Sequence, residues 1–160
     1  MSQTIDSLVP AELLPRLAAR AIDVLLLVCA GVTFGRQIGF GFDWLITTAA
    51  GVILYFTVAD VVAGATVGKA ALGLRVLGPD GGRPSFKQAL IRESFILLGA
   101  IPFAGPLLAF TSWVWIVLTI RSSPLRQGKH DLLAGGTRVV SQPGSRSRLS
   151  ADRKQSAGAP

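Results

Sequence analysis

Two aspartates, Asp23 and Asp60, lie in apolar stretches of the sequence, where an ionised carboxylate is costly. Near the centre of a bilayer the cost is about 2.5 kcal/mol or more, so each carboxylate should face protein or water and have a partner. Arg20 precedes Asp23 by three positions, a spacing that places two side chains on one face of a helix. Together with Arg16, these residues form one charged stripe.

The spacing allows two interpretations of these charges. At about 1.5 Å per residue, Asp23 lies roughly 10 Å beyond Arg16 and Asp60 roughly 13 Å before Lys69. On antiparallel neighbouring helices the two carboxylates then reach similar depths, where they could hold a proton or a small cation, one raising the pKa of the other. Alternatively, Arg20 neutralises Asp23 and the charges only pin the helices, or Asp60 faces lipid in its protonated form.

Other motifs point to packing rather than to catalysis. Gly31 and Gly35 have the four-residue spacing that lets two apolar helices approach closely, so we expect helix packing there. Residues 64–70 resemble a phosphate-binding loop, but the loop is one residue too short and has Ala70 where a hydroxyl would bind magnesium. His130 is the only histidine and has no cysteine nearby, which argues against a zinc or catalytic site. We therefore expect no enzyme activity, no cofactor and no metal.

The composition indicates what must position these residues. Of 160 residues, 50% are hydrophobic and 16% are charged, whereas an average soluble domain has about 25% charged residues. The single cysteine, Cys29, lies in an apolar run, which excludes a disulfide scaffold. The net charge of +7 would suit nucleic acid, but the aromatic residues lie inside apolar runs and not among the basic ones. A small membrane protein fits best.

Three apolar segments follow one another, at residues 17–35, 44–65 and 94–120. The first two meet the length of about 20 residues that a membrane-crossing helix needs. Short basic loops stay cytoplasmic, so the N-terminus and residues 66–93 should lie inside. Residues 121–160, with eight Lys and Arg, would lie outside if the third segment crossed once.

The third segment contains a break that could keep these basic residues on the cytoplasmic side. Pro102, Gly105 and Pro106 interrupt it, which predicts a broken, re-entrant hairpin whose first helix begins after Ser85. A single tilted and kinked crossing, with the tail outside, is the alternative. Residues 72–77 and 137–141 are predicted as short strands that pair on the cytoplasmic face, and residues 141–160 as a disordered basic tail.

Three ordered blocks resemble the RDD family of bacterial membrane proteins. They are residues 16–23 (RLAARAID), 64–76 (GATVGKAALGLRV) and 127–139 (QGKHDLLAGGTRV). The resemblance implies that Arg16, Asp23 and Asp131 are the residues that give the family its name, with Asp60 as a competitor for the third. In the middle block it points to a cytoplasmic loop motif of Thr66, Gly68, Lys69, Gly73 and Arg75. It further implies a multi-pass membrane protein with a transport role, and sodium/proton exchange has been proposed for some members.

We therefore expect an all-α integral membrane protein of the bacterial inner membrane. It should have two full transmembrane helices, a broken third apolar segment and a small cytoplasmic β element. Residues 1–15 form a cytoplasmic N-terminal segment, 16–140 the transmembrane domain and 141–160 the tail. The first functional hypothesis is transport of a small ion or solute through a homo-oligomer. The second is a non-catalytic scaffold or accessory subunit that binds a membrane partner protein or anionic lipid, and not nucleic acid.

Overall fold

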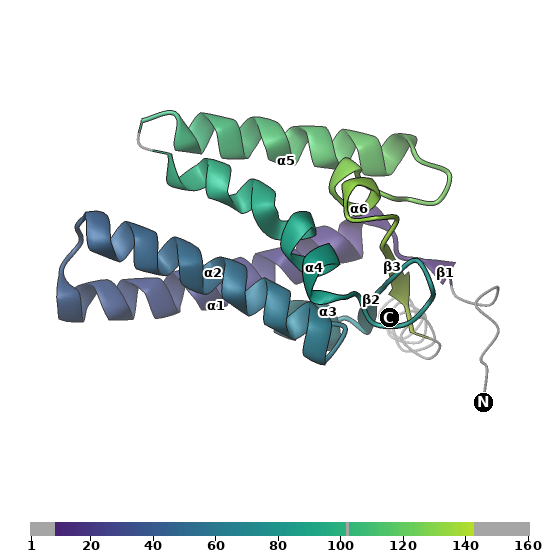
Figure 1. Ribbon diagram of the computed structural model, residues 1–160, viewed down its shortest axis with the longest axis horizontal. Helices are drawn as coiled ribbons and strands as arrows, with labels where there is room; N and C mark the ends of the chain where they lie inside the picture. Colours follow the sequence, from purple (N-terminus) through teal and green to yellow (C-terminus); the bar gives the residue numbers. More distant parts are fainter. Residues whose placement is uncertain (1–8, 102, 143–160) are drawn as a thin grey trace, which may run out of the picture.

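The computed structural model describes residues 9–101 and 103–142, and two long antiparallel helices extend from one end of it (Figure 1). They are α1 (Leu13–Ile38) and α2 (Phe42–Val62), and both are long and apolar enough to cross a membrane. Helix α1 begins four residues before the predicted segment, since Pro15 is tolerated in a first helical turn. Gly39 ends α1 with a φ of +89°, a left-handed conformation that favours glycine.

The third apolar segment folds back on itself, as the hairpin interpretation expects, and is not one kinked helix. Helix α4 (Phe86–Glu93) begins at the predicted cap, where the Ser85 hydroxyl accepts from the Gln88 amide and the Ser85 amide donates to Oε1 of the Gln88 side chain. It continues as a 3-10 helix, η2 (Ser94–Ala100). The chain then turns through Phe103, whose φ is +64°, into α5 (Gly105–Ser122). Helix α5 therefore ends at the end of the molecule where α1 begins (Figure 1).

A small sheet lies at that same end of the molecule, and we refer to this end as the sheet end. Strands β2 (Leu74–Leu77) and β3 (Arg138–Ser141) pair antiparallel, with Leu77 opposite Arg138, so the predicted pairing is confirmed. Strand β1 (Val9–Pro10) adds to the other side of β3, giving the order β1-β3-β2. The sequence did not predict β1, because two residues are too few to show the alternation of a strand. Ser141 belongs to β3, so the predicted tail begins at least one residue later.

Two short helices complete the sheet end. Helix α3 (Val67–Ala71) follows α2, and α6 (Lys129–Leu133) precedes β3. A small apolar core beneath the sheet joins the start of α1 to the strands, through Ala11, Ala19, Leu74, Val76 and Val139. Residues 143–160, the remainder of the predicted tail, lie outside the described residues.

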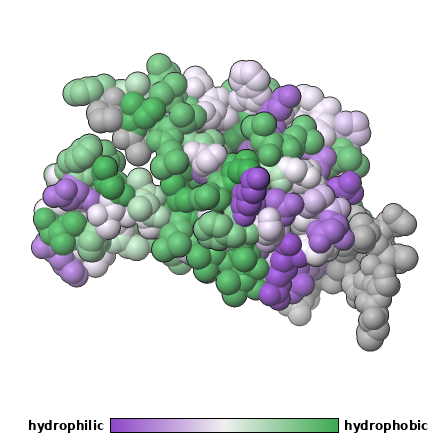
Figure 2. Space-filling model, viewed as in Figure 1, coloured by the Kyte–Doolittle hydropathy of each residue, from purple (hydrophilic) through white to green (hydrophobic). Residues whose placement is uncertain are grey.

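The long helices expose apolar side chains over much of their surface. Leu25 is 67% exposed, Leu54 59% and Leu118 57%. Figure 2 shows hydrophobic residues spread over the helices, while hydrophilic residues gather near the sheet end and at the far tip of the α1–α2 hairpin. Helices of a water-soluble protein of this size would bury such faces against a core. The pattern agrees with helices surrounded by lipid.

Candidate functional site

Eight ionisable side chains come together near the sheet end, and we call them the charge cluster. Four are cationic and four are acidic, so their formal charges cancel. They are Arg16, Arg20, Lys69 and Arg92, with Asp23, Asp60, Glu93 and Asp131. None of the four acidic residues is more than 2% exposed. They come from α1, α2, α3, α4 and α6, so the cluster joins segments that are far apart in the sequence.

Asp23 accepts three hydrogen bonds from uncharged donors. The Tyr55 hydroxyl donates to Oδ1 at 2.8 Å, the Thr66 hydroxyl to Oδ2 at 2.5 Å, and the Gly68 amide to Oδ1 at 2.8 Å. Thr66 also caps α3 by accepting from the Lys69 amide. The carboxylate thereby fastens α1 to α2 and α3, and its charge is met by donors from two other elements.

Gly68 is required for this arrangement because α3 packs against the backbone of α1. A Cβ atom at position 68 would lie 2.1 Å from the carbonyl oxygen of Ala19 and 3.0 Å from the Asp23 carboxyl carbon. Only glycine lets the amide approach the carboxylate so closely. The loop motif thus contributes Thr66, Gly68 and Lys69 to the site.

The hypothesis that Arg20 neutralises Asp23 is wrong. Arg20 instead donates to Glu93 at 2.7 Å, across the gap between α1 and α4. Its guanidinium also lies 3.9 Å from the centre of the Phe56 ring, with Phe95 and Trp113 within 6 Å. A desolvated cation over aromatic faces gains cation–π attraction in addition to the ion pair. Arg20 is therefore held away from Asp23 by partners that the helix spacing could not reveal.

Asp60 does not form a shared carboxylate pair with Asp23, and it does not face lipid. It is fully buried, and Lys69 Nζ donates to its two oxygens at 2.7 and 3.0 Å. This contact forms because α3 folds back beside the end of α2. Arg92 Nη1 approaches the same carboxylate at 3.9 Å.

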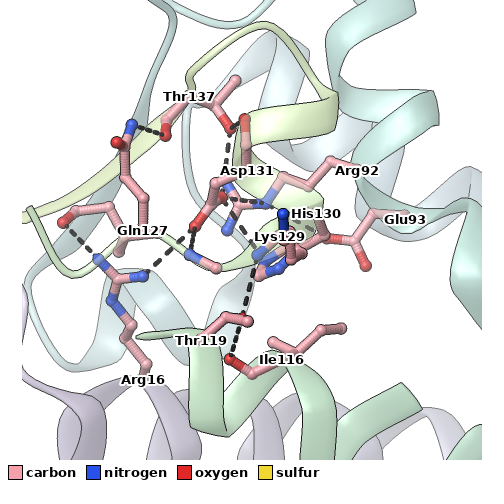
Figure 3. A network of polar contacts seen from close by, with 12 residues as sticks. Arg16, Arg92, Glu93, Ile116, Thr119, Gln127, Lys129, His130, Asp131 and Thr137 are labelled. Atoms are coloured by element: carbon pink, nitrogen blue, oxygen red, sulfur yellow. Dashed lines mark hydrogen bonds and ion pairs between the residues drawn. The ribbon is translucent and has the colours of Figure 1, made fainter. Parts of the chain in front are cut away.

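Asp131 is the other centre of the cluster, as Figure 3 shows. Arg92 Nε lies 3.4 Å and Arg16 Nη1 3.6 Å from its oxygens. The Gly128 amide and the Thr137 hydroxyl donate to it at 3.1 and 3.2 Å. Arg16 and Asp131, named together by the family resemblance, are thus in contact, whereas Asp23 has separate partners.

Sequence reasoning missed Arg92 and Glu93, which link the two halves of the cluster. Arg92 lies between Asp60 and Asp131, and Glu93 accepts from Arg20. Their position held a signal, because this charged pair directly precedes the uncharged run 94–120. Ionisable side chains next to an apolar membrane segment need partners within the protein.

Burial and neighbouring charges shift the pKa values of the groups outside the long helices. Burial alone would raise the pKa of Glu93, but Arg20, Lys69 and Arg92 outweigh it and lower the pKa to about 2. Burial would likewise raise the pKa of Asp131, which Arg92, His130 and Arg16 lower instead. Burial lowers the pKa of His130 to about 4, against the attraction of Asp131. At neutral pH Glu93 and Asp131 are therefore ionised and His130 is uncharged.

Lys69 is the one lysine of the charge cluster, and burial lowers its pKa even though Asp60 opposes the shift. The three arginines of the cluster cannot release a proton, because a guanidinium stays protonated in proteins. Lys69 also lines a cavity of about 70 Å³ together with Arg20, Arg92 and Glu93. A cavity of this size has room for a few water molecules. Water there would reach Arg92 Nε and Nη1, which are buried and lack a hydrogen bond.

The remaining predicted site residues lie away from the cluster. Gly31 and Gly35 are at the other end of α1, where a Cβ atom would lie 3.3 Å from the Thr48 side chain and 2.3 Å from the Phe40 ring, respectively. Gly73 turns the chain into β2 with a φ of +64°, and Arg75 is exposed on that strand. Among residues 9–101 and 103–142, no group of three His, Cys, Asp or Glu side chains is arranged to hold a metal.

No curated protein and no solved structure matches the chain. A family model does match, and it covers all three sequence blocks almost to their ends. The match spans residues 10–135, which include Arg16, Asp23, Asp60 and Asp131. Since this is most of the chain, and since its two long helices are apolar enough to cross a membrane, the protein belongs to the RDD family of membrane proteins.

Proposed function

We propose that this chain is a multi-pass protein of the bacterial inner membrane that takes part in transporting a small ion or solute as a homo-oligomer. The charge cluster is the observation that supports this proposal. Buried ionisable groups at the end of membrane helices are costly, and they commonly mark ion or proton pathways. Here six of the eight residues of the charge cluster line a cavity of about 70 Å³ that can hold water.

Within the cluster, the Asp60–Lys69 pair is best suited to exchange a proton. Asp23 already accepts three hydrogen bonds. The arginines stay protonated, so they do not exchange a proton. Lys69 has a lowered pKa and lines the cavity, so it can release a proton to water there while Asp60 stays beside it. Two long helices and one hairpin are too few to enclose a pathway, which is why the proposal includes several copies.

Lys69→Arg tests this role because it keeps the positive charge beside Asp60 but cannot release a proton. We expect wild-type protein in liposomes to support an ion flux coupled to a proton gradient. Lys69→Arg should lose the flux while its thermal unfolding midpoint stays close to that of the wild type. Arg75→Gln, which removes an exposed cation outside the cluster, is the matched control and should retain the flux. Normal flux in Lys69→Arg would contradict the proposed role of Lys69.

The second candidate function is a non-catalytic scaffold or accessory subunit. One observation favours it: the cluster fastens α1, α2, α3, α4 and α6 together, as a rigid platform for a partner protein would require. Absence of flux from the wild type under sodium, potassium and proton gradients would favour this function. Neither candidate is an enzyme.

The proposal places the sheet end in the cytoplasm, with both the N-terminus and the C-terminal tail inside. Basic loops at the sheet end support it, since such loops are retained in the cytoplasm. A cysteine at Ser123, in a Cys29→Ala background, should resist a membrane-impermeant maleimide applied to intact cells. A cysteine at Gly41, in the link between α1 and α2, should react. Labelling of the Ser123 variant from outside would show that the sheet end lies outside the cell, contrary to the proposal.

A further inference from the structure

An open groove lies at the sheet end between the start of α1 and the end of α5. Its volume is about 420 Å³. The floor is apolar and is formed by Leu13, Leu14, Leu17 and Ile120. The rim is formed by the last turn of α5 and the chain that follows it, with Arg121, Ser123, Pro124 and Arg126.

Two cations stand at the rim of this groove. Arg121 is exposed and is the first charged residue after the uncharged run 94–120. Arg126 has a φ of +51°, and its side chain is 45% exposed. The acidic neighbour is Glu12, whose carboxylate is 4.0 Å from Arg126 Nη1 and whose side chain is 56% exposed. Such an exposed pair is weak, and with two arginines against one glutamate the rim stays positive.

The floor of the groove is continuous with apolar surfaces that face the membrane. Leu14 is 76% exposed on α1, and Trp115 and Leu118 are 63% and 57% exposed on α5. The rim therefore lies where lipid-facing helices give way to charged loop, at the level of the phospholipid headgroups. An occupant that fits both parts needs an anionic head and hydrocarbon chains.

We propose that this groove binds an anionic phospholipid. Arg121 and Arg126 hold the phosphate, and the acyl chains lie over Leu14 and Leu17 and continue along α5. The proposal does not depend on transport, because neither arginine belongs to the charge cluster.

The test measures the thermal unfolding midpoint of the full chain in a neutral detergent with added phosphatidylglycerol or phosphatidylcholine. For the wild type, phosphatidylglycerol should raise the midpoint saturably and phosphatidylcholine should not. Each basic residue near an anionic surface contributes about 1 kcal/mol, so Arg121→Gln with Arg126→Gln should weaken binding about 30-fold. Arg121→Lys with Arg126→Lys should restore most of it.

Arg75→Gln with Arg138→Gln is the matched control, since it removes two exposed arginines of the sheet. This control should respond to phosphatidylglycerol like the wild type. If it loses as much binding as Arg121→Gln with Arg126→Gln, the effect depends only on net charge and the proposed site is overturned. Equal stabilisation by phosphatidylcholine, or by inorganic phosphate without acyl chains, would also overturn it. If the double glutamine variant does not fold, native mass spectrometry of the wild type still decides, because retention of both lipids equally contradicts the proposal. Leu14→Asn should weaken binding with the charges unchanged.

Discussion

Arg20 donates to Glu93 at 2.7 Å, although Asp23 lies only three residues further along the same helix. The pair joins α1 to α4, so it connects the first membrane helix to the hairpin that begins about 70 residues later. Both side chains are largely buried, at 14% and 3% exposed. Loss of one partner would leave the other charge without compensation inside the protein.

Glu93→Gln should therefore lower the free energy of unfolding by about 3–5 kcal/mol, the usual cost of leaving a buried charge unpaired. The double variant Arg20→Met with Glu93→Leu should be less destabilised than Arg20→Met or Glu93→Leu alone, because it leaves neither charge of the pair without its partner. Unfolding of the variants in detergent micelles measures both. A double variant whose loss equals the sum of the single losses would show that the pair is not coupled.

Sequence patterns predicted the long helices, the broken third segment and the β2–β3 pairing, because each depends on signals within a short stretch. Apolar run length, the residues at 102–106 and the Ser85 cap are all local. The ion pairs were not predictable in this way. The partner of Arg20 is chosen by the direction in which α4 approaches α1, and Asp23 is satisfied by Tyr55 and by a loop that folds back from α2. These are tertiary contacts with no fixed spacing in the sequence.

Gly68→Ala should destabilise the protein more than Gly35→Ala does. The new Cβ at position 68 would meet the backbone oxygen of Ala19 at 2.1 Å, and that oxygen cannot move without shifting α1. At position 35 the clash is with the Phe40 and Trp44 side chains, which can rotate. Overpacking commonly costs about 1–3 kcal/mol, and we expect Gly68→Ala at the upper end. Thermal unfolding of the two variants compares them, and equal midpoints would contradict the close contact between α3 and α1.

Because Asp23 accepts from three donors, loss of one donor should destabilise the protein less than loss of the carboxylate itself. Tyr55→Phe removes one of the donors and should cost about 1 kcal/mol of stability. Asp23→Asn should cost more, since its amide group would place hydrogens against donors that already point inward. Chemical unfolding of both variants tests the order. If Asp23→Asn is as stable as Tyr55→Phe, the carboxylate does not fasten α1 to α3.

The pH dependence of stability should carry the signature of His130, the only histidine in the chain. Burial lowers its pKa to about 4 in the folded protein, against 6.5 for a solvent-exposed histidine such as that of the unfolded chain. The unfolded chain therefore binds the extra proton first, and stability present above pH 6.5 is lost as the pH falls toward 4. Glu93, with a pKa lowered to about 2 from 4.5, adds a further loss only below pH 4.5. In His130→Phe, which keeps a ring beside Phe95, the unfolding midpoint should stay flat between pH 6.5 and 5, where the wild type already declines. A decline of equal size in the variant would assign the acid sensitivity to another group.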